Sequence, residues 1–158
     1  MRIAMGSDHA GFELKEILKE HVAQLGHDVI DVGTHSREST DYPTYGAAAA
    51  RKVVAGEAAV AILVCGTGIG IGIAANKVPG VRCAIVSDVY SAHMARSHNE
   101  ANAIALGGRV VGPGLAEDIV DSYLNAEFAG GRHAERVAML NDLDAARAEE
   151  GPATPAEC

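Results

Sequence analysis

The sequence contains no tryptophan, and aromatic residues of all kinds make up only 4% of its 158 residues. The core must therefore be built from aliphatic side chains, and 48% of the residues are hydrophobic. No apolar run approaches the roughly 20 residues that span a bilayer, and the sequence does not open with the charged and apolar segments of a secretion signal. We therefore expect a cytoplasmic protein that does not enter a membrane.

Positive charge is scarce, with 13 Lys and Arg against 21 Asp and Glu and a net charge of −8. A phosphate backbone requires a basic surface, so nucleic acid is not expected as a partner. Three cysteines, an odd number, argue against a disulfide framework and fit a reducing compartment. Four histidines are scattered without the spacing of a metal site and are given no role: His21, His27, His35 and His93.

Strand and helix patterns alternate along most of the chain, which predicts an α/β fold with a parallel sheet covered by helices on both faces. Five strands are expected at residues 2–6, 28–32, 58–64, 81–86 and 103–106. Six helices are expected at residues 11–25, 43–55, 69–77, 89–97, 114–125 and 131–147. This indicates one domain over residues 1–148, followed by a tail, 149–158, whose charge and prolines predict disorder.

The most informative segment is the glycine-rich run that follows the apolar residues 60–64 and reads Cys65-Gly66-Thr67-Gly68-Ile69-Gly70-Ile71-Gly72. Its backbone amides are unhindered, and the next helix directs its positive end toward them, so the loop suits a phosphate or a developing oxyanion. Neither the dinucleotide nor the nucleoside-triphosphate fingerprint is present. The thiol of Cys65 is a candidate proton carrier, although a cysteine at a strand end is as often only a packing residue.

Further polar residues follow other predicted strands. Asp8 and His9 come after the first strand, and Arg109 comes after the fifth. His98 and Asn99 come at the end of the helix that follows the fourth strand. Functional groups gather at the carboxyl ends of strands in such folds, so we expect all five at one edge of the sheet. Asp8 alone is equally explained as a helix N-cap. His98 alone is explained as a charge at a helix C-terminus.

Two arginines, Arg132 and Arg136, lie four residues apart on a predicted helix and therefore on one face. A phosphate between two such guanidinium groups would relieve their repulsion. The alternative is a solvated pair with Glu135 as local compensation.

Several of these segments together resemble the type B ribose-5-phosphate isomerase family, which also contains allose- and galactose-6-phosphate isomerases. The resemblance covers about residues 1–145 and is carried by residues 7–11 (Ser-Asp-His-Ala-Gly), 41–43, 65–70, 74–77, 98–99, 108–109, 131–133 and 136. It implies a Rossmann-like three-layer αβα sandwich that works without metal or cofactor. It also implies a homodimer, or a homotetramer, whose active sites use residues from both subunits.

The resemblance further implies a role for each candidate residue. Cys65 would move a proton between C1 and C2 of a sugar phosphate, through a cis-enediolate, as a thiolate favoured by the helix N-terminus. Thr67 and the amides of Gly66, Gly68, Ile69 and Gly70 would hold the enediolate oxygen. His98 would open the sugar ring, while Asp8, His9 and Asn99 would bind hydroxyls or assist proton transfer. The phosphate would be bound by Arg109, Arg132 and Arg136.

One branch of that family instead places a glutamate base at the position of Ile71 and a glycine at that of Cys65, so this chain resembles the cysteine-using branch. The sequence leaves three functions open. The first is ribose-5-phosphate isomerase, the second a hexose-phosphate isomerase of the same family, and the third a phosphosugar-binding protein without turnover. It does not determine the preferred sugar, the oligomer size, or which arginines cross a subunit boundary.

Overall fold

A computed structural model describes the backbone of residues 1–150 and the side chains of residues 1–146. The elements are β1 (Arg2–Ser7), α1 (Phe12–Gln24), β2 (Asp28–Asp31), α2 (Tyr42–Val54), β3 (Val60–Cys65), α3 (Ile69–Ala75), β4 (Cys83–Ile85), α4 (Val89–Asn99), β5 (Ala103–Gly107), α5 (Pro113–Asn125) and α6 (Arg132–Glu150). Every predicted strand and helix is present, with ends that differ by a few residues. The predicted tail begins inside α6, and its remainder, 151–158, lies outside the described residues.

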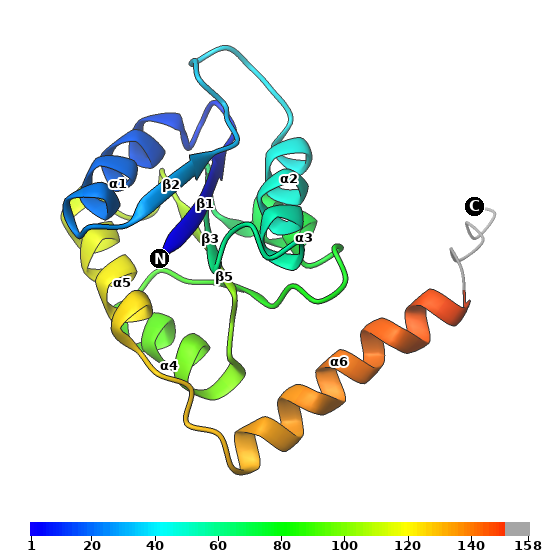
Figure 1. Ribbon diagram of the computed structural model, residues 1–158. Helices are drawn as coiled ribbons and strands as arrows, with labels where there is room; N and C mark the ends of the chain where they lie inside the picture. The colour runs from blue at the N-terminus through cyan, green and yellow to red at the C-terminus, as the bar shows by residue number, and fades with distance from the viewer. Residues whose placement is uncertain (151–158) are drawn as a thin grey trace.

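The five strands form one parallel sheet in the order β2-β1-β3-β5-β4. The register pairs Ser7 with Val64 and Cys65 with Gly107, so β1, β3 and β5 end at the same edge. Helices lie on both sides of the sheet (Figure 1). The α/β prediction, with its five-stranded parallel sheet, is confirmed.

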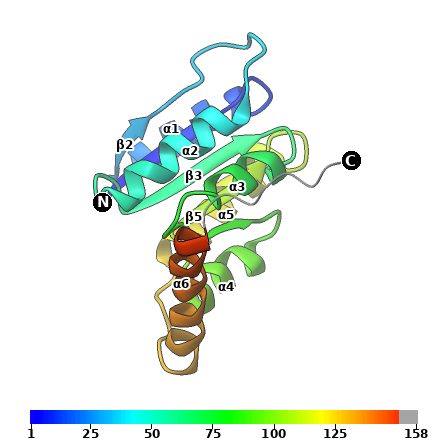
Figure 2. The same ribbon diagram turned by 90° about the vertical axis from the view of Figure 1, so that its right-hand side faces the viewer.

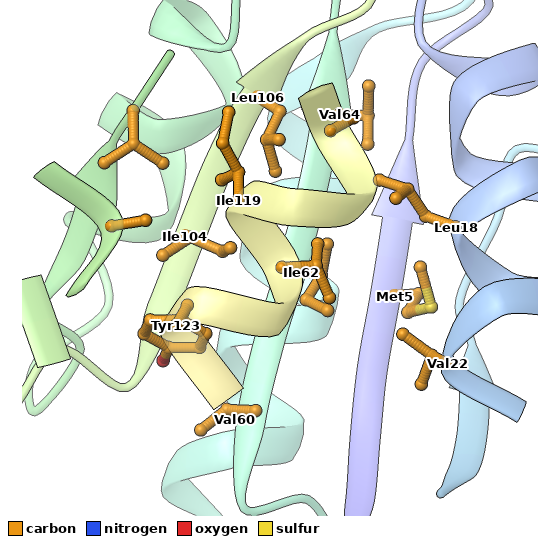
Figure 3. Close-up of a cluster of buried hydrophobic side chains, with 14 of the residues drawn as sticks. Met5, Leu18, Val22, Val60, Ile62, Val64, Ile104, Leu106, Ile119 and Tyr123 are labelled. Carbon is orange, nitrogen blue, oxygen red and sulfur yellow. The ribbon is translucent and has the colours of Figure 1, made fainter. Parts of the chain in front are cut away.

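The two faces of the sheet are packed with side chains of different size. On one face, Ile62, Ile104 and Leu106 meet α1, α4 and α5, whose buried residues include Leu18 and Tyr123 (Figure 3). The opposite face carries alanine and cysteine as well as Leu63, and α2 and α3 cover it. Strand residues alternate between the faces, and this alternation assigns Cys65 to the face with small side chains.

Helix α6 begins beside the end of α4 and extends away from the sheet and its other helices (Figures 1 and 2). Its first residues follow a linker in which the Ala129 amide donates to the Ser97 carbonyl at 2.9 Å. Further along, Asp144 accepts from the Gly80 amide at 2.7 Å. None of the helices in residues 1–150 combines the length and hydropathy that a membrane crossing needs.

Candidate active site

Three loops meet at the carboxyl edge of the sheet, and they contain the predicted residues that follow β1, β3 and β5. Gly11 lies so close over the peptide that joins Val64 and Cys65 that a Cβ at this position would overlap it. The Gly108 amide donates to the Cys65 carbonyl at 2.8 Å, and the Arg109 amide donates to the Gly66 carbonyl at 3.0 Å. The loops are thus fixed to one another by their backbones.

Cys65 is the last residue of β3, and its side chain lies at the centre of this junction with 4% exposure. Its sulfur accepts a hydrogen bond from the Gly68 amide at 3.2 Å. Gly68 has a φ of 78°, a left-handed conformation that favours glycine, and this turn aims its amide back at the sulfur.

The rest of the glycine loop presents polar groups beside Cys65. Thr67 is exposed, and its hydroxyl accepts from the Ile69 amide at 3.3 Å. The exposed Arg109 passes over Gly66, where a Cβ would lie 3.8 Å from the arginine Cδ. Cys65, Thr67 and Arg109 therefore lie together at one edge, as the sequence predicts.

Asp8 and His9 lie in the adjoining loop, and the structure gives both of them backbone partners. The Asp8 carboxylate accepts from the amides of Ala10 at 2.9 Å and Gly11 at 3.0 Å. This contact shapes the loop before α1, although the N-cap position itself is occupied by Gly11. The imidazole Nδ1 of His9 lies 3.1 Å from the Thr40 amide and 3.2 Å from the Thr40 carbonyl oxygen.

A buried ion-pair network holds the start of the loop that brings Thr40 to His9. Lys15 is completely buried, and its ammonium lies 2.7 Å from both carboxylate oxygens of Asp31. Asp31 also accepts from Lys19 at 3.0 Å and from the Gly33 amide at 3.0 Å. Burial alone would raise the pKa of Asp31, but these hydrogen bonds outweigh it and lower the pKa below its ordinary value.

The prediction that all the polar residues share one edge is wrong for His98 and Asn99. The Asn99 carbonyl accepts from the side chain of Arg82, which directly precedes β4, at 3.1 Å, so the end of α4 lies at the amino edge. The reason is geometric: α4 returns antiparallel to the strands and carries its C-terminus to the opposite edge. With a rise of about 3.3 Å per residue, the length of β5 alone separates the edges by roughly 13 Å.

Arg132 and Arg136 lie near His98, and so they too are far from Cys65. The rings of His98 and His133 stack with centroids 4.1 Å apart and an interplanar angle of 10°. Burial lowers the pKa of His133, and the nearby His98, Arg132 and Arg136 lower it further. The chain thus carries two separate polar groups, which we call the thiol edge (residues 8–9, 65–70 and 109) and the arginine edge (residues 98–99, 132–133 and 136).

Two contacts at the thiol edge were not assigned from the sequence. The ring of Tyr42 lies against Gly70, where a Cβ would be 2.7 Å from the nearest ring carbon. Tyr42 belongs to one of the segments that carry the family resemblance, so the sequence did point to this residue. The Thr40 contact with His9 uses only backbone atoms of Thr40 and has no side-chain signature.

The other buried thiol differs from Cys65 in its surroundings. Burial raises the pKa of Cys83 to about 12, so this side chain is a neutral thiol at physiological pH. Within residues 1–146, no three side chains of His, Cys, Asp or Glu gather as a metal site requires.

Large apolar side chains are exposed close to both edges. On α6, Met139 and Leu143 are 67% and 66% exposed, and with Asn99, Arg136 and Leu140 they line a groove of about 420 Å³. Beside the glycine loop, Ile69 and Ile73 are 52% and 50% exposed. Exposed apolar patches of this kind mark contact surfaces.

Comparison with known proteins identifies the protein family that has this fold. Residues 3–140 match the family described as Ribose/Galactose Isomerase, and the chain belongs to that family. It is 48% identical over 146 residues to ribose-5-phosphate isomerase B of Escherichia coli, covering 92% of this chain and 98% of that protein.

Two further relatives are similar over most of their length. The solved structure of Clostridium thermocellum ribose-5-phosphate isomerase B is 51% identical and superimposes with a TM-score of 0.91, covering 92% of this chain and 99% of the other. The galactose-6-phosphate isomerase subunit LacB of Clostridium acetobutylicum is 46% identical over 128 residues, covering 81% of this chain and 74% of LacB. The Rossmann-like fold implied by the resemblance is therefore confirmed.

Proposed function

We propose that this chain is an aldose-ketose isomerase that interconverts ribose 5-phosphate and ribulose 5-phosphate. The observation that carries the proposal is the sequence identity of 48% to 51% with two ribose-5-phosphate isomerases B, which extends over 92% of this chain. The buried, amide-bonded Cys65 supports it independently, because isomerisation needs a base held beside oxyanion donors.

In the proposed reaction, the Cys65 thiolate removes the proton from C2 of the open-chain aldose, and the electron pair of that bond forms the C1–C2 double bond of a cis-enediolate. The negative charge that this step places on O1 is neutralised by a proton from the O2 hydroxyl, and the thiol returns the carbon proton to C1, which leaves a hydroxyl on C1 and the ketose carbonyl at C2. Thr67 and the loop amides of Gly66, Ile69 and Gly70 hold the enediolate oxygen, while the Gly68 amide is directed at the sulfur. One such donor contributes about 3 to 4 kcal/mol to the transition state.

The proposal assigns the arginine edge to ring opening and phosphate binding. Ring opening breaks the bond between C1 and O4 and moves a proton from the O1 hydroxyl to O4, a transfer suited to the imidazole of His98. Arg132 and Arg136 bind the phosphate together with Arg109, while Asp8, His9 and Asn99 bind hydroxyls or assist proton transfer. Remote binding of the phosphate then holds the reacting carbons in place.

We further propose that the protein acts as a homodimer in which the thiol edge of one subunit completes the arginine edge of its partner. Two observations support this. The edges lie too far apart within one chain to hold one pentose phosphate between them. Exposed apolar residues flank both, on α6 and beside the glycine loop. A twofold dimer of this design contains two equivalent sites, and a tetramer would pair two such dimers.

A mixing experiment tests the shared site. Cys65→Ala and Arg136→Ala each damage a different edge, so a hybrid dimer keeps one site with both edges intact. Measured at substrate concentrations well below KM, where Arg136→Ala alone keeps about a tenth of the wild-type rate, random mixing should give about a quarter of wild-type activity, since half the dimers are hybrids with one intact site of two. Activity no higher than the average of the two variants alone would contradict a shared site, and sedimentation velocity would give the oligomer size.

Proton exchange tests the chemistry itself. In D₂O, an isomerase must wash solvent deuterium into C2 of ribose 5-phosphate as the enediolate forms and returns, which NMR detects directly. A phosphosugar-binding protein without turnover would bind the sugar and leave that proton in place.

The similarity to LacB keeps a hexose-phosphate isomerase as the second candidate. Relative kcat/KM for ribose 5-phosphate, allose 6-phosphate and galactose 6-phosphate distinguishes the two. We keep the cytoplasm as the proposed compartment, because a charged phosphosugar does not cross a bilayer unaided.

A further inference from the structure

His133 lies at the contact between α4 and α6 and has no role in the reaction as described above. Its ring stacks on that of His98, with 4.1 Å between centroids and 10° between planes. Both rings are only partly exposed. Since the rings come from different helices, the stack fixes the orientation of one helix end relative to the other.

The stack is the contact that orients His98. Within residues 1–146, neither imidazole has a hydrogen-bond or ion-pair partner, so the nitrogens of His98 are open to a ligand while the face of its ring is covered. A ring that must take a proton from one sugar oxygen and deliver it to another needs a defined plane. The neighbouring bond from the Ala129 amide to the Ser97 carbonyl, at 2.9 Å, fixes the linker one residue before His98.

The charges around His133 favour its neutral form. His98 faces it from α4, and Arg132 and Arg136 belong to the first turns of α6. Burial, followed by His98, Arg132 and Arg136 in that order, lowers the pKa of His133. A neutral ring next to His98 does not oppose the uptake of a proton by His98, whereas an imidazolium would.

We propose that His133 is a positioning residue, which stacks on His98 and holds its ring in the plane that ring opening requires. This inference rests on the proposed function, and specifically on His98 as the group that opens the sugar ring. It predicts that loss of His133 slows ring opening while leaving proton transfer at Cys65 intact.

The two steps are separable because ribulose 5-phosphate, whose O5 is esterified, has no furanose form. His133→Ala should lower kcat for ribose 5-phosphate about tenfold, as expected for a displaced acid-base group. Exchange of the C1 proton of ribulose 5-phosphate with D₂O should stay within about twofold of wild type, because it requires only enediolate formation. His133→Phe keeps a flat ring and should recover most of the lost turnover.

Two controls accompany these variants. His93→Ala removes an exposed histidine from the same helix α4 and should leave both rates unchanged. The inhibition constant of inorganic phosphate should be unchanged in His133→Ala, which would exclude displacement of the arginines as the cause.

Equal losses of turnover and of C1 exchange in His133→Ala, or no loss of either, would overturn the positioning role. So would a phenylalanine variant as slow as the alanine variant. A wild-type protein that exchanges no proton at all would instead overturn the proposed function, so the two failures are distinguishable.

Discussion

The thiol edge and the arginine edge are built in different ways. At the thiol edge, backbone hydrogen bonds join the loops after β3 and β5, Gly11 of the loop after β1 packs closely on the peptide before Cys65, and Cys65 is only 4% exposed. At the arginine edge, Asn99, Arg132 and Arg136 are exposed side chains on helix ends. The difference teaches that the thiol edge is preorganised by folding, whereas in the proposed dimer the arginine edge would be completed only by a partner or a ligand.

The largest effect is expected from the thiol itself. Cys65→Ala should lower kcat about 10³-fold, because it removes the proposed base, while the melting temperature changes little. The matched control is Cys83→Ala, which removes a buried thiol that is neutral at physiological pH and should retain turnover. Near-normal kcat in Cys65→Ala would remove the sulfur from the mechanism.

The turn that directs an amide at the sulfur should be the next most sensitive feature. In Gly68→Ala, a side chain at φ 78° would also lie 2.9 Å from the Leu106 carbonyl carbon. We expect a loss of about 3 kcal/mol in the free energy of unfolding, measured by urea denaturation, and a loss of activity.

Gly114→Ala provides the comparison for that variant. Its Cβ would meet open space within the first turn of α5, so stability should stay the same or rise by about 0.5 kcal/mol. Equal stability of the two variants would show that the backbone at Gly68 is not constrained.

The network behind the thiol edge should respond to both mutation and pH. Asp31→Asn leaves the Lys15 ammonium buried without its main partner and should cost about 3 kcal/mol of unfolding free energy. Because the folded-state pKa of Asp31 is lowered, its contribution is complete above the unfolded value near 4 and is lost as the pH falls through the folded value. Urea denaturation between pH 3 and 7 would measure this.

A double variant separates the charge from the geometry of that network. Adding Lys15→Met to Asp31→Asn removes the stranded ammonium and should recover much of the lost stability. A double variant that is less stable than Asp31→Asn alone would contradict a charge-based explanation.

The smallest effect on stability is expected at the arginine edge. Arg136→Ala should raise KM about tenfold, the cost of one charge-assisted hydrogen bond. The free energy of unfolding should change by no more than about 0.5 kcal/mol, since this side chain is exposed. Arg51→Ala, which removes an exposed arginine from α2, should alter neither value, and steady-state kinetics with urea denaturation would test both variants.

The sequence predicted the fold well because alternating strand and helix patterns are set by local periodicity. It also predicted correctly that Cys65, Thr67 and Arg109 lie close together, since residues that directly follow parallel strands share an edge. His98 and Asn99 were misplaced because they end a helix rather than follow a strand, and the return direction of α4 decides their edge. That direction was available from the sequence through the geometry of the crossover.

Other features of the site had no local signal. The contact between Thr40 and His9 depends on the course of residues 33–41, which no periodic pattern fixes. The stack of His98 on His133 joins two helices that are separated by a strand and a further helix. Such contacts arise from the packing of helix ends, which depends on the whole sheet.

The narrow layer beneath α2 and α3 has a consequence for how this protein tolerates change. The sheet offers these helices mainly alanine and cysteine, and Gly72 of α3 comes close enough that a Cβ there would lie 3.2 Å from the Cβ of Ala105. One added methyl group in this layer would push α3, and the loop beside the Cys65 sulfur, away from the sheet. The opposite layer is packed with large side chains, so there a smaller side chain would leave a cavity. Variation should therefore be asymmetric across the sheet, with enlargement selected against on one side and shrinkage on the other.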